Sequence, residues 1–217
     1  MNTIVLSTLL GSDTGAIAKN VAKDLGYDLI DRAILEGTMR QYGLTGFGKV
    51  YTTPPNFLDL TNSKNLQVLS MLNDTLQALA QRGRTLILVR GGYVTLNKYE
   101  DVLHVRLNAP FRVRTDRVME REGLEVRAEA EQQVANDDRA RTLFVKRFYG
   151  RDWHDARDFD LVLNTDLIDQ PTVEAWITEA LRIQEAKPVR KGAQLARKAK
   201  VDPLLVSAIN ESMMRSA

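Results

Sequence analysis

The sequence has 217 residues, with 30 Lys and Arg against 28 Asp and Glu, which gives a formal net charge of +2. Its 44% hydrophobic and 27% charged residues are typical of a globular domain and exclude a disordered or membrane-spanning chain. The absence of cysteine excludes disulfides, thiolate zinc sites and cysteine nucleophiles, and only two histidines argue against a histidine-rich metal site.

The chain begins with a pattern that predicts a buried strand, a tight turn and a helix. Residues 2–8 are mostly apolar, residues 9–15 contain two glycines, and residues 16–25 carry apolar side chains at helical spacing. The apolar run is too short to cross a membrane and no basic residue precedes it, so we expect a cytoplasmic protein without membrane attachment. Strand, glycine turn and helix form the context in which backbone N–H groups bind phosphate.

The turn nevertheless lacks the Walker motif G-x-x-x-x-G-K-[ST], in which a lysine contacts the transferred phosphate and a hydroxyl holds Mg²⁺. No stretch of residues 7–17 matches this motif, and Asp13 places a carboxylate where a phosphate would lie. A phosphate loop and a plain glycine turn are therefore both open interpretations.

Strands and helices alternate along the rest of the chain. After a second short strand, Asp31 occupies the N-cap position of a helix predicted over residues 31–42. Further strands are predicted at residues 85–89, 102–107 and 161–164, and further helices at residues 66–82, 110–122, 125–148 and 173–186. This alternation indicates an α/β fold, with a mostly parallel sheet flanked by helices, over residues 1–186.

Two segments stand outside this pattern. Residues 43–63 contain three glycines and two prolines, which predicts an irregular segment that is mobile or faces a partner. Residues 187–217 carry a net charge of +5, with a linker at residues 187–192 and short helices predicted at 193–200 and 203–215. This basic tail is expected to pack on the domain or on a second copy in a homodimer; binding to nucleic acid phosphates is the alternative, although aromatic residues for base stacking are missing.

Several segments, taken in order, resemble the cytidylate kinase-like branch of the P-loop nucleoside monophosphate kinases over about 185 residues. They include Ile17-Ala18-Lys19, Leu88-Val89-Arg90-Gly91-Gly92, Asp138-Arg139-Ala140-Arg141 and Phe159-Asp160-Leu161-Val162-Leu163-Asn164-Thr165. The resemblance implies a P-loop kinase-like fold with a helical lid segment at about residues 123–158. It also implies ATP and Mg²⁺ as cofactors and transfer of the γ-phosphoryl group to CMP, dCMP or a related monophosphate.

The resemblance also implies roles for individual residues. ATP would contact Gly11, Ser12, Asp13, Thr14, Gly15, Ala16, Arg117 and Arg121. Arg139, Arg141 and Arg121 would act on the transferred phosphoryl group, and the acceptor would lie near Asp31, Arg32, Arg90 and Gly91. No protein residue is assigned to a metal.

By this resemblance, Thr14 stands where true cytidylate kinases carry the phosphate-loop lysine, and Asp13 stands at a glycine. The resembled branch usually lacks this lysine and has Gly-Ser-Gly-Gly-Arg, but here Asp13-Thr14-Gly15 replaces Gly-Gly-Arg, so the substitute arginine is missing as well. Asp13 could help to hold Mg²⁺, or it could repel phosphate. At ~4 Å and an effective dielectric near 20, two unit charges interact by about 4 kcal/mol, enough to damage ATP binding unless a cation intervenes.

Structural interpretations remain open for the same residues. The arginines could belong to a solvated charged helix with Asp137 and Asp138 as neighbours, Asp31 could be a plain N-cap, and Arg90 could end a strand. Tyr149, Trp153 and Phe159 are expected to pack in the core rather than stack on a base, and His104 is expected to be a core residue. For the whole chain, a catalytically inactive relative that senses nucleotides or acts as a scaffold is the alternative to a kinase.

Overall fold

The computed structural model describes residues 2–43, 47–56 and 58–214. Its centre is a five-stranded parallel sheet in the order β2-β3-β1-β4-β5. The strands are β1 (Thr3–Thr8), β2 (Asp28–Ile30), β3 (Thr85–Ile87), β4 (Val102–Asn108) and β5 (Leu161–Asn164). The expected α/β fold with a parallel sheet is therefore confirmed.

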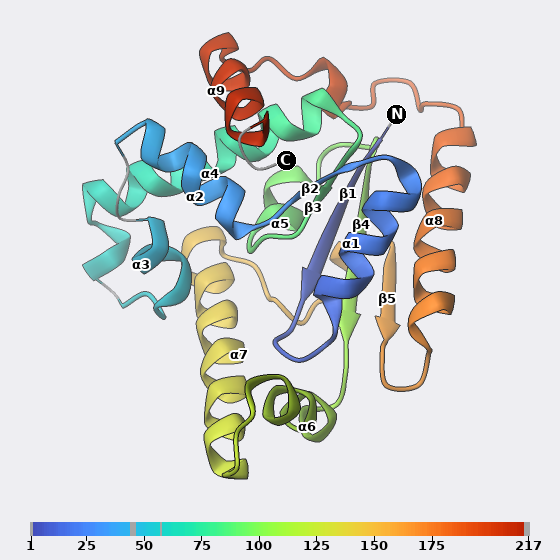
Figure 1. Cartoon of the computed structure of the whole chain (residues 1–217). Helices are drawn as coiled ribbons and strands as arrows, with labels where there is room; N and C mark the ends of the chain where they lie inside the picture. Colours follow the sequence, from blue (N-terminus) through green and yellow to red (C-terminus); the bar gives the residue numbers. More distant parts are fainter. Residues whose placement is uncertain (1, 44–46, 57, 215–217) are drawn as a thin grey trace.

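Helices cover both faces of this sheet, with α1 and α8 on one face and α4, α5 and α7 on the other (Figure 1). The helices are α1 (Thr14–Leu25), α2 (Arg32–Gln41), α3 (Phe47–Thr52), α4 (Ser63–Arg82), α5 (Gly92–Leu96), α6 (Phe111–Glu122), α7 (Arg127–Tyr149), α8 (Gln170–Ala186) and α9 (Pro203–Met214). Among the described residues, none of these helices combines the length and the apolar character needed to cross a membrane.

The alternation of side chains along β1 divides the core into two layers. Ile4 and Leu6 point toward α1 and α8, whereas Val5 points toward the opposite layer, and all three are fully buried. A parallel sheet with helices on both faces requires such apolar strands, because neither face meets water. The carboxyl ends of the strands meet at the lower edge in Figure 1, where the β1–α1 turn and α6 lie. Ligands of open α/β sheets bind at this edge.

The expectation of an irregular segment at residues 43–63 is wrong for its described part. This part contains α3, and Phe47 and Tyr51 of that helix are buried in the core. The short α5 was also missed. Both helices have six residues or fewer and contain glycine, so their periodicity is too short to stand out in the sequence. Residues 44–46 and 57 of the predicted segment lie outside the described residues.

The basic tail packs on its own domain. Leu205 and Ile209 of α9 are buried, and α9 contacts α2 and α4. The predicted helix at residues 193–200 is instead a single 3-10 turn, Ala196–Lys198, which is preceded by a parallel bridge between Tyr99 and Gln194. The expectation that the tail packs on its own domain is therefore confirmed. Homodimer formation and nucleic acid binding stay predictions.

Candidate functional site

The phosphate-loop turn at residues 9–15 lies against α6. Gly11 has a φ of +82°, and a Cβ atom at this position would come within 2.5 Å of the Arg114 carbonyl oxygen. A side chain therefore cannot be accommodated without moving α6. The requirement for glycine here comes from the close approach of two backbone segments as well as from the positive φ.

The hydroxyl groups of the turn form hydrogen bonds with other residues of the same turn. The Ser12 hydroxyl donates to the Leu9 carbonyl oxygen at 2.7 Å, and its oxygen lies 2.9 Å from the Thr14 hydroxyl. Both Ser12 and Thr14 are buried. Thr14, at the position where true cytidylate kinases were expected to carry lysine, therefore offers neither a positive charge nor an exposed hydroxyl to a ligand.

Arg117 of α6 neutralises Asp13. The Asp13 carboxylate lies 2.8 Å from Arg117 Nε. The same guanidinium donates to the Thr165 hydroxyl at 3.0 Å and to the Thr165 carbonyl oxygen at 2.8 Å. The negative charge of the loop is therefore neutralised by an arginine of the same chain. Through Arg117, α6 also connects the β1–α1 turn to the turn after β5.

A second arginine cluster lies at the carboxyl ends of β3 and β4. Arg90 follows β3 and is 5% exposed, and its Nη1 donates to the Tyr51 carbonyl oxygen at 2.6 Å. Its Nη2 donates to Asp137 of α7, and Arg141 donates to the other carboxylate oxygen of Asp137 at 3.0 Å. Two guanidinium groups thus share one carboxylate. The Nε atoms of Arg90 and Arg141 are buried and have no hydrogen-bond acceptor among the described residues.

The charges in this cluster are coupled. Burial and then the neighbouring Arg141 lower the pKa of Arg90. Burial opposes ionisation of Asp137, but the charges of Arg141 and Arg90 outweigh it and hold the pKa of this carboxyl below its usual range. With both guanidinium groups charged and Asp137 ionised, the cluster keeps a net positive charge, which favours an anion at this edge of the sheet.

Aromatic side chains support this cluster from within the core. Arg106 of β4 is buried over the Trp153 ring at 4.7 Å, and Arg141 lies 5.4 Å from the same ring. Trp153 packs edge-to-face on Tyr93 at 5.6 Å. Tyr149 packs against Gly91 and donates to Asn73. The expected core packing of the aromatic residues is confirmed.

Other residues expected at the site lie elsewhere or have structural partners. Arg121 is exposed and pairs with Glu122, while Arg139 is exposed and has no hydrogen-bond or ion-pair partner among the described residues. Asp31 caps α2 by accepting from the Ala33 and Ile34 N–H groups, and neighbouring Arg32 lies over the Tyr51 ring at 5.6 Å. Their roles toward a ligand stay predictions.

Several residues that complete the edge were not predicted as site residues, and Asp137 and Asp138 were expected only as neighbours of the arginines on a charged helix. Arg114 makes a bidentate ion pair with Asp138, Asp137 bridges two arginines, and Tyr51 and Thr165 accept from arginines. Asp137 stands four residues before Arg141 on one helix, so only this ion pair could have been predicted from the spacing of the residues. The other contacts join segments far apart in the chain.

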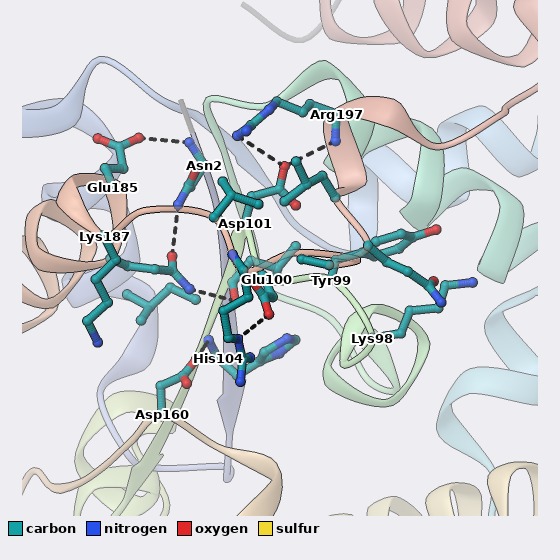
Figure 2. A pocket seen from close by; sticks show the side chains of 18 of the residues that line it. Asn2, Lys98, Tyr99, Glu100, Asp101, His104, Asp160, Glu185, Lys187 and Arg197 are labelled. Atoms are coloured by element: carbon teal, nitrogen blue, oxygen red, sulfur yellow. Dashed lines mark hydrogen bonds and ion pairs between the residues drawn. The ribbon is translucent and has the colours of Figure 1, made fainter.

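Two pockets lie at opposite edges of the sheet. A pocket of about 410 Å³ at the carboxyl edge is lined in part by Arg106, Arg114 and Trp153. A larger pocket of about 940 Å³ lies at the amino-terminal edge, under the start of the tail (Figure 2). Figure 2 shows His104 there; it is buried as expected, its ring nitrogens have no hydrogen-bond partner among the described residues, and burial lowers its pKa.

The sheet order and the turn after β1 define a P-loop kinase-like fold, and the comparisons agree. The model of the cytidylate kinase-like family matches residues 3–167. This chain therefore belongs to the cytidylate kinase-like family, and it is a kinase-like nucleotide-binding protein.

Curated relatives agree with this assignment, and solved structures agree with the fold. A cytidylate kinase of Methanopyrus kandleri is 29% identical over 167 residues, covering 75% of this chain and 83% of the relative. A cytidylate kinase of Methanococcoides burtonii is 24% identical over 183 residues, covering 82% and 95%. An uncharacterized protein from Eubacterium ventriosum has a TM-score of 0.62 at 17% identity, covering 84% of this chain and 99% of that structure. A shikimate kinase of Bacteroides thetaiotaomicron has a TM-score of 0.51 at 14% identity, covering 85% and 98%. These structures show the fold alone.

Proposed function

We propose that this protein binds a nucleoside monophosphate, CMP or dCMP by family, at the carboxyl edge of the sheet and does not transfer phosphoryl groups at the rate of a lysine-containing kinase. The Arg90–Asp137–Arg141 cluster carries this proposal. Guanidinium groups bind phosphate through paired N–H donors, and here two buried Nε donors have no acceptor within the part of the chain that the structure describes. The proposal includes a cytoplasmic location for the protein.

The residues of the phosphate loop do not fit ATP and Mg²⁺ in this arrangement. The loop has no lysine, the Thr14 hydroxyl is bonded to Ser12, and Arg117 is paired with Asp13. Phosphoryl transfer depends on positive charge positioned around the migrating group. Arg139 and Arg141 remain the candidates for that charge, and of these two Arg141 is already bound to Asp137. This favours a nucleotide-binding, catalytically weak relative over an efficient kinase.

Isothermal titration calorimetry with CMP, dCMP, UMP and AMP tests the binding. We expect CMP or dCMP to bind, and Arg141→Met to weaken the affinity at least about tenfold, since a charge-assisted hydrogen bond contributes ~1.5–3 kcal/mol. Arg182→Met is the matched control, because Arg182 is an exposed arginine of α8 that pairs with Glu179. Its affinity should equal that of the wild type.

Turnover is measured separately, by following ADP release from ATP in the presence of each monophosphate. Binding of CMP with negligible ADP release supports the proposal. Rapid turnover would contradict the catalytic part of it, and failure of all four monophosphates to bind would contradict the nucleotide-binding part.

A further inference from the structure

We propose that the Asp13 carboxylate acts as an internal anion of the phosphate loop, where it takes the place of a phosphate oxygen on Arg117 and excludes the triphosphate of ATP. Asp13 is a positioning residue in this proposal, because it acts on the ligand through Arg117. The inference deepens the proposed function, since it concerns the donor side of the same sheet edge.

The first observation is that Asp13 does not serve α1 as a cap. Aspartate at an N-cap position ordinarily accepts a hydrogen bond from the second or third N–H group of the helix. Asp13 occupies the N-cap position of α1 in a left-handed conformation, with φ +54°, and its side chain makes no capping hydrogen bond. Its carboxylate lies instead 2.8 Å from Arg117 Nε. The helix therefore does not explain why a carboxylate stands here.

The second observation is how fully Arg117 is engaged. Besides its ion pair with Asp13, its guanidinium donates hydrogen bonds to the Thr165 hydroxyl, the Thr165 carbonyl oxygen and, at 3.4 Å, the Gly11 carbonyl oxygen. Arginine binds phosphate through the same N–H groups. A phosphate at the loop must therefore compete with Asp13 for Arg117.

The pair is also placed where a ligand could compete for it. The Asp13 side chain is 49% exposed and the Arg117 side chain 23% exposed, so the ion pair faces solvent at the mouth of the loop. By contrast, Thr14 and Ser12 are buried beneath it. A phosphate that approaches the loop from solvent therefore meets an Arg117 side chain that the Asp13 carboxylate already occupies.

Simple repulsion and competition for Arg117 make different predictions. If Asp13 only repels phosphate, removing its charge improves ATP binding whatever residue stands at position 117. If Asp13 occupies Arg117, the improvement requires Arg117. A double-mutant cycle separates the two, because it measures the coupling between the two positions.

The experiment measures the affinity for ATP with Mg²⁺ by calorimetry in the wild type, Asp13→Asn, Arg117→Met and the double variant. Asparagine keeps the size of the side chain and tolerates the left-handed conformation. We expect Asp13→Asn to bind ATP at least about tenfold more tightly than the wild type, and the double variant to lose this gain. A wild-type affinity too weak to measure sets a lower limit for the gain.

Asp24→Asn is the matched control, because Asp24 is an exposed carboxylate on the same helix and its removal changes the net charge equally. It should leave the ATP affinity unchanged. Unchanged affinity in Asp13→Asn, or an equal gain with and without Arg117, would overturn the proposal. Thermal unfolding of each variant verifies that it is folded. CMP affinity in the same proteins tests the proposed function independently, because the arginine cluster that binds it does not include Asp13 or Arg117.

Discussion

Arg114 of α6 donates two hydrogen bonds to Asp138 of α7, from Nη1 to Oδ1 at 2.9 Å and from Nη2 to Oδ2 at 2.7 Å. The same guanidinium donates to the Ala109 and Leu10 carbonyl oxygens, so one buried side chain joins α6, α7 and the phosphate-loop turn. This arginine thus holds the segments around the turn together.

Replacement of Arg114 should therefore destabilise the fold. Arg114→Met leaves the partly buried Asp138 without its partner, and we expect a loss of about 2 kcal/mol in the free energy of unfolding. Urea denaturation followed by circular dichroism measures this. Arg112→Met on the same helix is the control, because Arg112 is 86% exposed and its ion pair should contribute less than about 0.5 kcal/mol. Equal effects of the two substitutions would contradict the role of Arg114.

Restoring the kinase-like residues of the phosphate loop should change its ligand affinity. Asp13→Gly combined with Thr14→Lys removes the carboxylate and supplies the missing cation, so ATP should bind more tightly than to the wild type. Thr14→Lys alone leaves Asp13 beside the new ammonium group and should give a smaller gain. Calorimetry with ATP and Mg²⁺ measures both, and unchanged affinity in the double variant would mean that the turn does not face phosphate.

His104 should make stability fall in mildly acidic solution. Burial lowers its pKa in the folded protein, while the nearby carboxylates Asp160 and Asp158 act in the opposite direction. The unfolded state therefore binds more protons, and stability decreases as the pH falls below the ordinary histidine value of about 6.5. Urea denaturation at pH 7.5 and pH 5.5 should show a smaller decrease in His104→Gln than in the wild type. His154→Gln, which changes an exposed histidine, should behave like the wild type.

A substitution at Gly91 should destabilise the protein in two ways, through the positive φ angle and through a clash with Tyr149, and a comparison with Gly123 separates these two effects. Gly91 and Gly123 both have positive φ angles, but a Cβ atom at Gly91 would lie 3.0 Å from the Tyr149 hydroxyl, whereas nothing lies within 4 Å at Gly123. Gly123→Ala should cost about 1 kcal/mol from the backbone alone. Gly91→Ala should cost roughly 1–3 kcal/mol more, because Tyr149 must move. Equal losses in the two variants would argue against this contact.

Packing of the tail on the domain should contribute to the free energy of unfolding. Leu205 of α9 is 3% exposed and Leu204 is 74% exposed. Leu205→Ala should lower the free energy of unfolding by about 3 kcal/mol, whereas Leu204→Ala should have an effect below about 0.5 kcal/mol. If both are neutral in thermal and urea unfolding, the tail does not pack on the domain in solution.

Local sequence patterns predicted most of the architecture, because the hydrophobic periodicity of strands and long helices can be recognised within a short stretch of residues. The helix cap at Asp31, the glycine that ends α6 and the alternation of strands with helices all follow from neighbouring residues. Helix α3 could not be predicted in this way, because its apolar residues are buried only through contacts with α7 and α4, which are distant in the sequence. Short elements owe their stability to tertiary contacts rather than to their own propensity.

The site was harder to predict than the fold for the same reason. The sequence identified Arg90, Arg117 and Arg141 as candidates. Arg141 has its partner Asp137 on the same helix, but the partners of the other two come from distant segments: Asp137 and Tyr51 for Arg90, and Asp13 and Thr165 for Arg117. The conflict between Asp13 and phosphate was visible in the sequence. That a guanidinium from a distant helix neutralises it depends on how α6 folds back over the turn.

Strand β4 connects the two edges of the molecule. His104, beneath the tail, and Arg106, over Trp153, are separated by one residue and point to the same face of the sheet. Side chains two residues apart on a strand lie about 7 Å from one another. Removal of the tail would therefore admit water to a position a single side-chain spacing from Arg106. The described part of the tail, residues 187–214, therefore packs on the rest of the chain, although its basic composition suggested a separate segment.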